Sequence, residues 1–339
     1  MSSSARPVIA YWLLSVCALV FAMVVLGGVT RLTHSGLSIV EWQPIVGTLP
    51  PLTEAQWQET FAKYQRTPEY QIVNRDMNLS GFKDIFWLEY FHRLLGRLIG
   101  LVFLLPFLYF LARKQIDRVL FPKLLILFAL GAAQGLLGWL MVKSGLVDVP
   151  RVSPYRLTAH LGLAVLIYAA TLWVALGLLR PQPPATVPAT TLRYFGFGVT
   201  SLIFLMILSG GFVAGTRAGF AFNDWPWMHG RLVPEGLFAL EPAWVNVFEN
   251  LATVQFNHRL LAYLLCLIVP LYWWLARRYP LASGTRALFH LLLAMFVVQV
   301  LLGISTLLQH VPVPLAAAHQ AGAMVVFTFA LLINHRLRA

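Results

Sequence analysis

The stretch GGVTRLTHSGLSIVEW, residues 27–42, has an altered copy later in the chain. The copy reads GGFVAGTRAGFAFNDW and covers residues 210–225, and the two align without a gap. The same offset pairs Gly47 with Gly230. A copy so far along the chain indicates that the protein is built from two similar halves.

The same landmarks follow this stretch in each half. They are a His-Arg-Leu-Leu segment, a QxLLG segment and a closing histidine, always in that order. They begin at His92, Gln134 and His160 in the first half and at His258, Gln299 and His319 in the second. We therefore expect both halves to adopt the same arrangement.

Hydropathy predicts what each half is made of. Hydrophobic residues form 59% of the chain and charged residues 11%, whereas a soluble domain usually carries about 25% charged residues. Apolar runs of roughly 20 residues can cross about 30 Å of hydrocarbon as helices. We predict an all-α integral membrane protein whose eight transmembrane helices lie near 8–30, 84–111, 120–142, 157–179, 194–215, 251–275, 287–308 and 315–334. Since four spans return the chain to the same side, the two four-helix-bundle repeats run parallel.

The connections predict the domain boundaries and the orientation. The proline-rich stretch RPQPPATVPAT, residues 180–190, cannot continue a helix. We expect an amino-terminal repeat (1–180), a cytoplasmic linker (181–193) and a carboxy-terminal repeat (194–339). Arginine and lysine are densest in the short loops on the side of the termini, which places both termini in the cytoplasm. These loops facing anionic lipid account for the net charge of +12, so we expect no nucleic-acid partner.

A long outer loop, residues 31–83, follows the first span. Its segment LTEAQWQETFAKYQ has a capping signal at Thr53 and apolar residues at helical spacing. This pattern predicts a short amphipathic helix on the outer surface. The alternative is an irregular loop packed on the bundle.

Four histidines lie near the outer ends of the even-numbered spans, at matching positions of the two halves. Ionisable residues at membrane depth are costly and usually mark an interior site. Zinc or copper would need three or four protein ligands, whereas two imidazoles from facing helices suit the two axial faces of a haem iron. We predict one porphyrin site in each half toward the outer face, the first between His92 and His160 and the second between His258 and His319. The remaining histidines are interpreted as structural, namely His34, His229, His290, His310 and His335.

One acid distinguishes the two histidine segments. LEYFHRLLGR, residues 88–97, carries Glu89 where VQFNHRLLAY, residues 254–263, carries Gln255. Glu89 stands three residues before His92 and so shares its helix face. Glutamine can keep the same hydrogen bonds but cannot exchange a proton, so the first half alone can perform proton chemistry. We infer that the first porphyrin is a substrate and the second an electron-transferring cofactor.

An arginine directly follows the first histidine of each half. Arg93 and Arg259 therefore point about 100° away from these histidines around the helix. They either bind carboxylates such as haem propionates or support the site by capping loop carbonyls. The sequence leaves both roles open.

Four long motifs resemble, in this order, the haem A synthases (heme A synthases) of proteobacteria and mitochondria. They are TRLTHSGLSIVEWQPIVGTLPPL, NRDMNLSGFKDIFWLEYFHR, FENLATVQFNHRLLAY and LAAAHQAGA, and the resemblance covers nearly the whole chain. It implies oxidation of the C8 methyl group of haem O to the formyl group of haem A, through successive hydroxylations, for cytochrome oxidase biogenesis.

The same resemblance implies the site residues, the location and the partners. It implies substrate haem O at His92 and His160, haem b (heme b) at His258 and His319, and Glu89 as the essential acid. It further implies the bacterial cytoplasmic (inner) membrane as the location, with haem O synthase or cytochrome oxidase assembly factors as partners.

One departure from the family matters for the mechanism. Some members carry a cysteine pair in the first outer loop, whereas residues 31–83 contain no cysteine. A mechanism through that thiol pair is excluded, and the residues do not identify the electron donor. The competing interpretation is a non-catalytic dihaem b-type cytochrome that transfers electrons from quinol, which gives no reason for an acid beside only one iron. A haem transporter or chaperone would need porphyrin binding without turnover.

Overall fold

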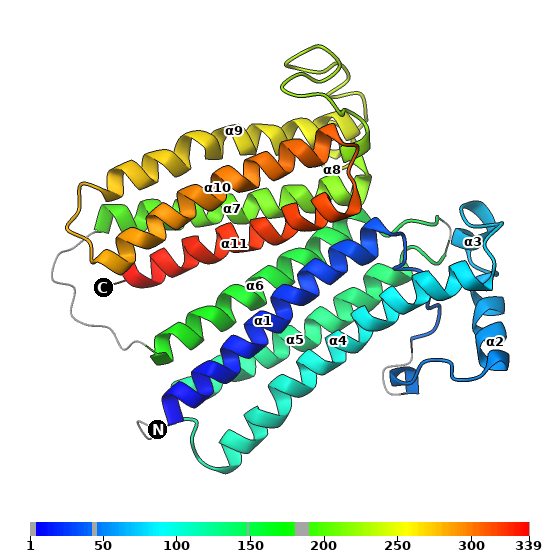
Figure 1. The fold of residues 1–339 in the computed structure, drawn as a ribbon, viewed down its shortest axis with the longest axis horizontal. Coiled ribbons are helices and arrows are strands. Elements are labelled where there is room, and N and C mark those ends of the chain that lie inside the picture. The colour runs from blue at the N-terminus through cyan, green and yellow to red at the C-terminus, as the bar shows by residue number, and fades with distance from the viewer. Residues whose placement is uncertain (1–4, 43–45, 148, 180–189, 339) are drawn as a thin grey trace.

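The computed structural model describes residues 5–42, 46–147, 149–179 and 190–338, and it is almost entirely helical there (Figure 1). Within these residues, eight helices are long and apolar enough to cross a membrane. They are α1 (Ala5–Leu32), α4 (Leu79–Ala112), α5 (Leu120–Lys143), α6 (Pro154–Leu179), α7 (Thr190–Thr216), α9 (Leu251–Ala276), α10 (Ser283–Leu308) and α11 (Val313–Leu337). The prediction of an all-α protein with eight spans is confirmed.

The helices pack as two groups of four. In one group α1 contacts α4 and α6, and α5 contacts α6; in the other α7 contacts α9 and α11, and α10 contacts α11. The groups meet where α1 contacts α11 and α6 contacts α7 (Figure 1). Each contact in the first group thus has a counterpart in the second.

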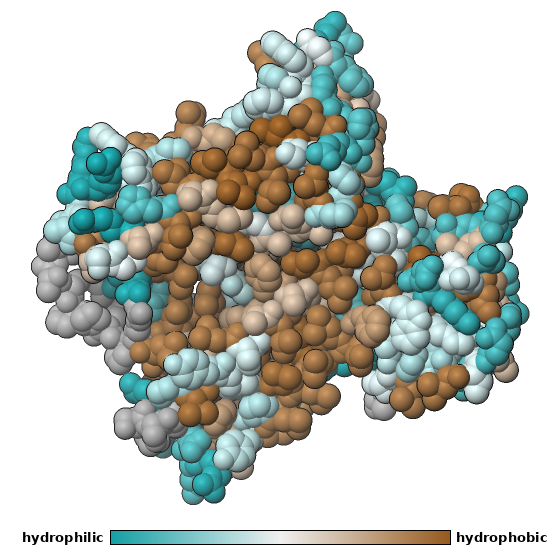
Figure 2. Space-filling model, viewed as in Figure 1, coloured by the Kyte–Doolittle hydropathy of each residue, from teal (hydrophilic) through white to brown (hydrophobic). Residues whose placement is uncertain are grey.

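The outer surface of the bundle is apolar, as contact with lipid requires. Figure 2 shows hydrophobic residues over the sides of the helices and hydrophilic residues toward the ends of the molecule. In its most apolar window, α1 has 44% of its residues buried and α5 only 6%. Therefore α1 lies in the interior, where it borders both groups, and α5 presents most of its side chains to lipid.

The long loop after α1 folds onto an extension of α4. The predicted amphipathic helix is confirmed as α2 (Glu54–Tyr64), whose N-cap Thr53 forms a capping box with Gln56. A second short helix, α3 (Pro68–Ile72), was not predicted. Aromatic side chains join α2 to α4 in one buried cluster, namely Trp57, Phe61, Tyr64, Phe82, Phe86 and Tyr90.

Two predicted boundaries differ from the structure. Because the side chain of Asn78 accepts a hydrogen bond from the Gly81 amide, α4 begins at Leu79, outside the predicted span. Helix α7 begins at Thr190, so the last residues of the expected linker 181–193 are helical. Residues 180–189, which hold most of that linker, lie outside the described residues.

Candidate functional site

Two histidines lie near each other within the amino-terminal group of helices. His92 lies on α4 and His160 on α6, close enough for the imidazole rings to interact electrostatically. Each ring lies against a glycine of another helix. A methyl group placed on Gly27 of α1 would stand 3.0 Å from Cε1 of His92, and one on Gly138 of α5 would stand 2.9 Å from Cε1 of His160. All four helices therefore shape the space around the two rings.

The carboxy-terminal group repeats this arrangement. His258 of α9 and His319 of α11 also interact electrostatically. Methyl groups placed on Gly210 of α7 and Gly303 of α10 would stand 3.4 Å and 2.7 Å from Cε1 of these rings. Gly210 is the first residue of the repeated glycine pair, and Gly303 is the last residue of the second QxLLG segment. The sequence repeat thus preserves the contacts that position the histidine rings.

Two imidazoles in each pair are too few to hold a metal ion by themselves, but they suit a metal ion whose other ligands come from a porphyrin. Across the described residues, no group of three or more His, Cys, Asp and Glu side chains gathers as an all-protein metal site requires. A porphyrin iron instead needs one imidazole on each axial face. Nδ1 of His92 and Nδ1 of His160 are buried without a hydrogen-bond partner in the described part of the chain, which marks an incomplete polar site. The residues present fit a haem with two histidine ligands.

Glu89 lies on α4 one helical turn before His92 and is 3% exposed. Its Oε2 accepts hydrogen bonds from the Ser38 hydroxyl at 2.7 Å and the Ile39 amide at 2.8 Å. Its Oε1 accepts from Nη2 of Arg93 at 2.7 Å and from Nε at 3.0 Å. Four donors from two elements therefore stabilise the ionised carboxylate in a buried position.

The matching position of the second half has different chemistry. Nε2 of Gln255 donates to the carbonyl of Phe222 at 2.9 Å. Phe222 is the repeat counterpart of Ile39, and Ala221 stands where the first half has Ser38. The acid and the hydroxyl that donates to it are thus replaced together. The second half keeps the link between helix and loop without an ionisable group.

Comparison with known proteins places the chain in a family. A family model described as cytochrome oxidase assembly protein, COX15-CtaA, matches residues 10–331. The chain belongs to the COX15-CtaA family. A "Heme A synthase" of Nitrosospira multiformis is 59% identical over 332 residues, which cover 97% of this chain and 93% of that protein.

Relatives from a plant and from human are similar over the same length. "Heme A synthase COX15" of Arabidopsis thaliana is 46% identical over 345 residues, covering 98% of this chain and 75% of that protein. The protein of the same name from Homo sapiens is also 46% identical over 345 residues, covering 99% and 84%. The resemblance inferred from the motifs is confirmed.

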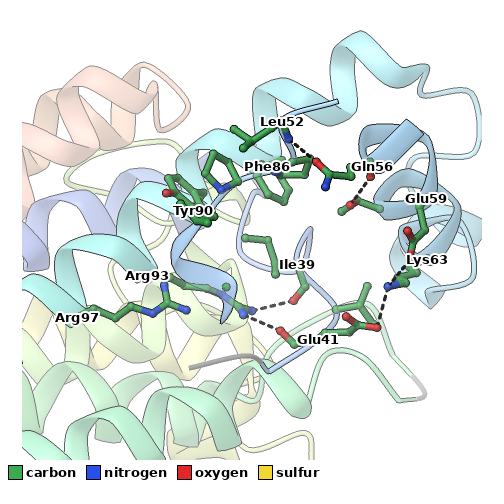
Figure 3. Close-up of a pocket in the computed structure, with 16 residues that line it drawn as sticks. Ile39, Glu41, Leu52, Gln56, Glu59, Lys63, Phe86, Tyr90, Arg93 and Arg97 are labelled. Atoms are coloured by element: carbon green, nitrogen blue, oxygen red, sulfur yellow. Dashed lines mark hydrogen bonds and ion pairs between the residues drawn. The ribbon is translucent and has the colours of Figure 1, made fainter. Parts of the chain in front are cut away.

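Both arginines of this COX15-CtaA protein lie against loop carbonyls. Nη2 and Nη1 of Arg93 donate to Ile39 and Glu41 at 2.8 and 3.1 Å (Figure 3). Nη1 of Arg259 donates to Trp227 at 2.7 Å, and Nη2 donates to Phe222 at 3.2 Å. Of the two roles that the sequence left open, the geometry shows contacts of the supporting kind.

The role of the two QxLLG glutamines was not predicted from the sequence. Nε2 of Gln134 donates to the carbonyl of His160 at 2.9 Å, and Nε2 of Gln299 donates to that of His319 at 2.9 Å. Gln299 also lies 3.1 Å from Nδ1 of the His319 ring. In each half the glutamine holds the helix that bears the closing histidine, and the glycine one turn later lies against its ring. The repetition of the segment was the available signal.

A cavity of about 360 Å³ lies between α2, α4 and the loop that follows α1, and Arg93 is one of its lining residues. Figure 3 shows Phe86, Tyr90 and Arg93 of α4 along one side and the α2 side chains opposite. None of the four histidines lines this cavity. It is therefore separate from the space around the histidine pairs.

Proposed function

We propose that this chain is a haem A synthase, which oxidises the C8 methyl group of haem O to the formyl group of haem A for cytochrome oxidase biogenesis. The observation that carries this proposal is the presence of two matched histidine pairs, of which only one has a buried acid beside it. The relatives called heme A synthase support the same assignment over nearly the whole chain.

The two sites have different proposed occupants. His92 and His160 hold the iron of the substrate haem O, because their pair is the one beside Glu89. His258 and His319 hold haem b, because Gln255 beside them cannot exchange a proton. Haem b supplies one-electron transfer when it is bound at this second site.

Glu89 acts on the methyl group through its charge and its hydroxyl partner. When electrons leave the methyl group ahead of its protons, positive charge develops at that carbon. A carboxylate held in place by four donors stabilises such charge without reorganising. The Ser38 hydroxyl is the partner that can both accept and release a proton, which gives protons a route away from Glu89.

The proposed location is the bacterial cytoplasmic (inner) membrane, with both termini in the cytoplasm. The start of α1 and the end of α11 lie at one end of the bundle, and α2 and α3 project from the other end (Figure 1). His160, His258 and His319 lie near the starts of α6, α9 and α11, which supports haem sites toward the outer face. Haem O synthase and cytochrome oxidase assembly factors are the proposed partners.

The chain is further proposed to consist of two parallel repeats, 1–180 and 194–339, joined by a cytoplasmic linker. The matching helix contacts of the two groups support this duplication. So do the equivalent contacts of the histidine rings with glycines in both groups.

Extraction and chromatographic separation of the bound pigments test the proposed function. The protein is purified from cells that also express haem O synthase. We expect haem O, its hydroxylated product or haem A together with haem b. Haem b alone, present at two per chain, would contradict the enzyme assignment and favour the dihaem cytochrome.

A further inference from the structure

We propose that Arg31 and Arg217 form a carboxylate-binding site between the two halves, and that this site binds propionate groups of the porphyrins. The inference rests on the proposed function, which assigns a porphyrin to each histidine pair. We call the contact between residues 31–34 and 214–217 the seam.

The seam brings the outer ends of α1 and α7 together. Nη2 of Arg31 donates to the carbonyl of Ala214 at 2.9 Å, and Nη2 of Arg217 donates to Nδ1 of His34 at 3.1 Å. Residues 31 and 214 are counterparts in the two copies of the repeated stretch, and so are residues 34 and 217. Each copy therefore touches its own counterpart, which places both guanidinium groups at the boundary between the two groups of helices.

Helix geometry directs both arginines outward from the histidine rings. Gly27 lies against His92, and Arg31 follows four residues later on the same face of α1, about 6 Å further along the axis. Gly210 lies against the ring of the second half, and Arg217 follows seven residues later, just beyond the end of α7. The propionates occupy one edge of a porphyrin, so a ring whose edge faces outward from either pair points its propionates toward the seam.

The charges at the seam are unbalanced in favour of an anion. Arg31 interacts electrostatically with Arg217, Arg151 and Glu69. In the part of the chain that the structure describes, neither Arg31 nor Arg217 forms an ion pair with a carboxylate, and Nε of Arg31 is buried without a hydrogen-bond partner. Three guanidinium groups thus lie within electrostatic range of one acid, and guanidinium groups match carboxylates in charge and shape.

The acid at the seam does not neutralise these arginines by direct contact. Glu69 of α3 is 4% exposed, and its Oε2 has no hydrogen-bond partner among the described residues. His34 adds no positive charge, because burial and the charges of Arg217 and Arg31 lower its pKa. The neutral ring accepts the hydrogen bond from Arg217. A porphyrin edge with two carboxylates complements the positive charge that remains.

A titration with two porphyrins tests the site. The full chain in lipid nanodiscs is titrated with iron protoporphyrin IX and with its dimethyl ester, whose propionates are masked. We expect wild-type protein to bind the free acid about tenfold more tightly than the ester, equivalent to about 1.4 kcal/mol. Arg31→Gln and Arg217→Gln should each lower this ratio toward one by weakening binding of the acid alone, and Arg31→Lys should restore part of it.

Arg75→Gln is the matched control, because it removes the same positive charge at an exposed position away from the seam. The Arg75 side chain donates to the Gln71 carbonyl. This variant should keep the wild-type ratio. Ester binding with a two-histidine spectrum reports that each variant is folded. An unchanged ratio in both glutamine variants would overturn the site while leaving the proposed function in place. If the glutamine variants keep the wild-type ratio but lose bound phosphatidylglycerol, the arginines bind a lipid phosphate instead, and the propionate site is likewise overturned. Absence of any porphyrin binding by the wild type would overturn both.

Discussion

The guanidinium group of Arg93 donates two hydrogen bonds to one carboxylate oxygen of Glu89, at 3.0 Å from Nε and 2.7 Å from Nη2. The same guanidinium donates to two carbonyls of the loop that follows α1. The acid proposed for catalysis and the support of the loop after α1 therefore share one ion pair. A change at Glu89 affects both, and experiments need to separate the two effects.

The paired substitution Ser38→Ala/Glu89→Gln converts this site to the chemistry of its counterpart, Ala221 with Gln255. We expect both porphyrins to stay bound, while oxidation of haem O falls about 100-fold or more, as loss of acid–base catalysis predicts. Pigment chromatography of the purified variant measures both quantities. Full haem A production would remove Glu89 from the mechanism, and exposed Glu59→Gln should behave as wild type.

Glu89→Gln alone should also reduce stability. It leaves Arg93 without its acid while Ser38 and Ile39 still donate toward position 89. Breaking a fully buried ion pair by changing one partner lowers the free energy of unfolding by about 3–5 kcal/mol. The loss here should be smaller because the Arg93 side chain is 16% exposed. Thermal unfolding in detergent should show a lower midpoint for the single variant than for wild type. Equal midpoints would show that the ion pair does not support the loop.

Gly138→Ala should empty the first porphyrin site. The added methyl group would stand 2.9 Å from Cε1 of His160, so the ring must move. Gly135→Ala adds the same methyl group on the same helix, where no atom lies within 4 Å. We expect overpacking to cost about 1–3 kcal/mol in Gly138→Ala alone. The haem content per chain measures the effect, and equal content in the two variants would contradict the proposed contact.

Gln299→Leu and Gln134→Leu should act on different haems. Each change leaves the carbonyl of a closing histidine without its side-chain donor, at a cost of about 1–3 kcal/mol. Gln299→Leu should weaken haem b, and Gln134→Leu should weaken the substrate haem, so each variant is the control for the other. Redox difference spectra distinguish the two haems. A loss of haem b in both variants would contradict the assignment of separate sites.

Glu69 should make stability depend on pH. Burial, and then the charge of Glu89, raise the pKa of Glu69 from 4.5 to about 7, against the opposing effects of Arg217, Tyr64 and Arg31. Between these values the folded protein holds a proton that the unfolded chain has lost, so stability falls as pH rises through this window. Glu69→Gln should remove this fall and exceed wild-type stability by up to about 3 kcal/mol at pH 8. The thermal unfolding midpoints of wild type and Glu69→Gln, plotted against pH, should separate above pH 5. Parallel curves would refute the shift, and exposed Glu54→Gln should match wild type.

Local patterns explain the predictions that the structure confirmed. The eight spans follow from apolar runs whose length matches the hydrocarbon thickness, and α2 follows from a capping signal at Thr53 with apolar residues at helical spacing. Both signals lie within a few turns of chain. Helix α3 was missed because its five residues are too few for a periodic pattern, and its Thr67 cap lies in a polar stretch.

The sequence by itself determined the eight-span helical fold, the matched histidines and the exchange of Glu89 for Gln255, because hydropathy and repeated spacing are properties of the chain. Only the tertiary structure decided which groups meet: Arg93 with carbonyls of a loop about 50 residues away, and Arg31 with Ala214 across the seam. The burial of Glu69 likewise depends on the packing of the outer region. Such contacts depend on how helices and loops distant in sequence pack together, and no local pattern of residues specifies them.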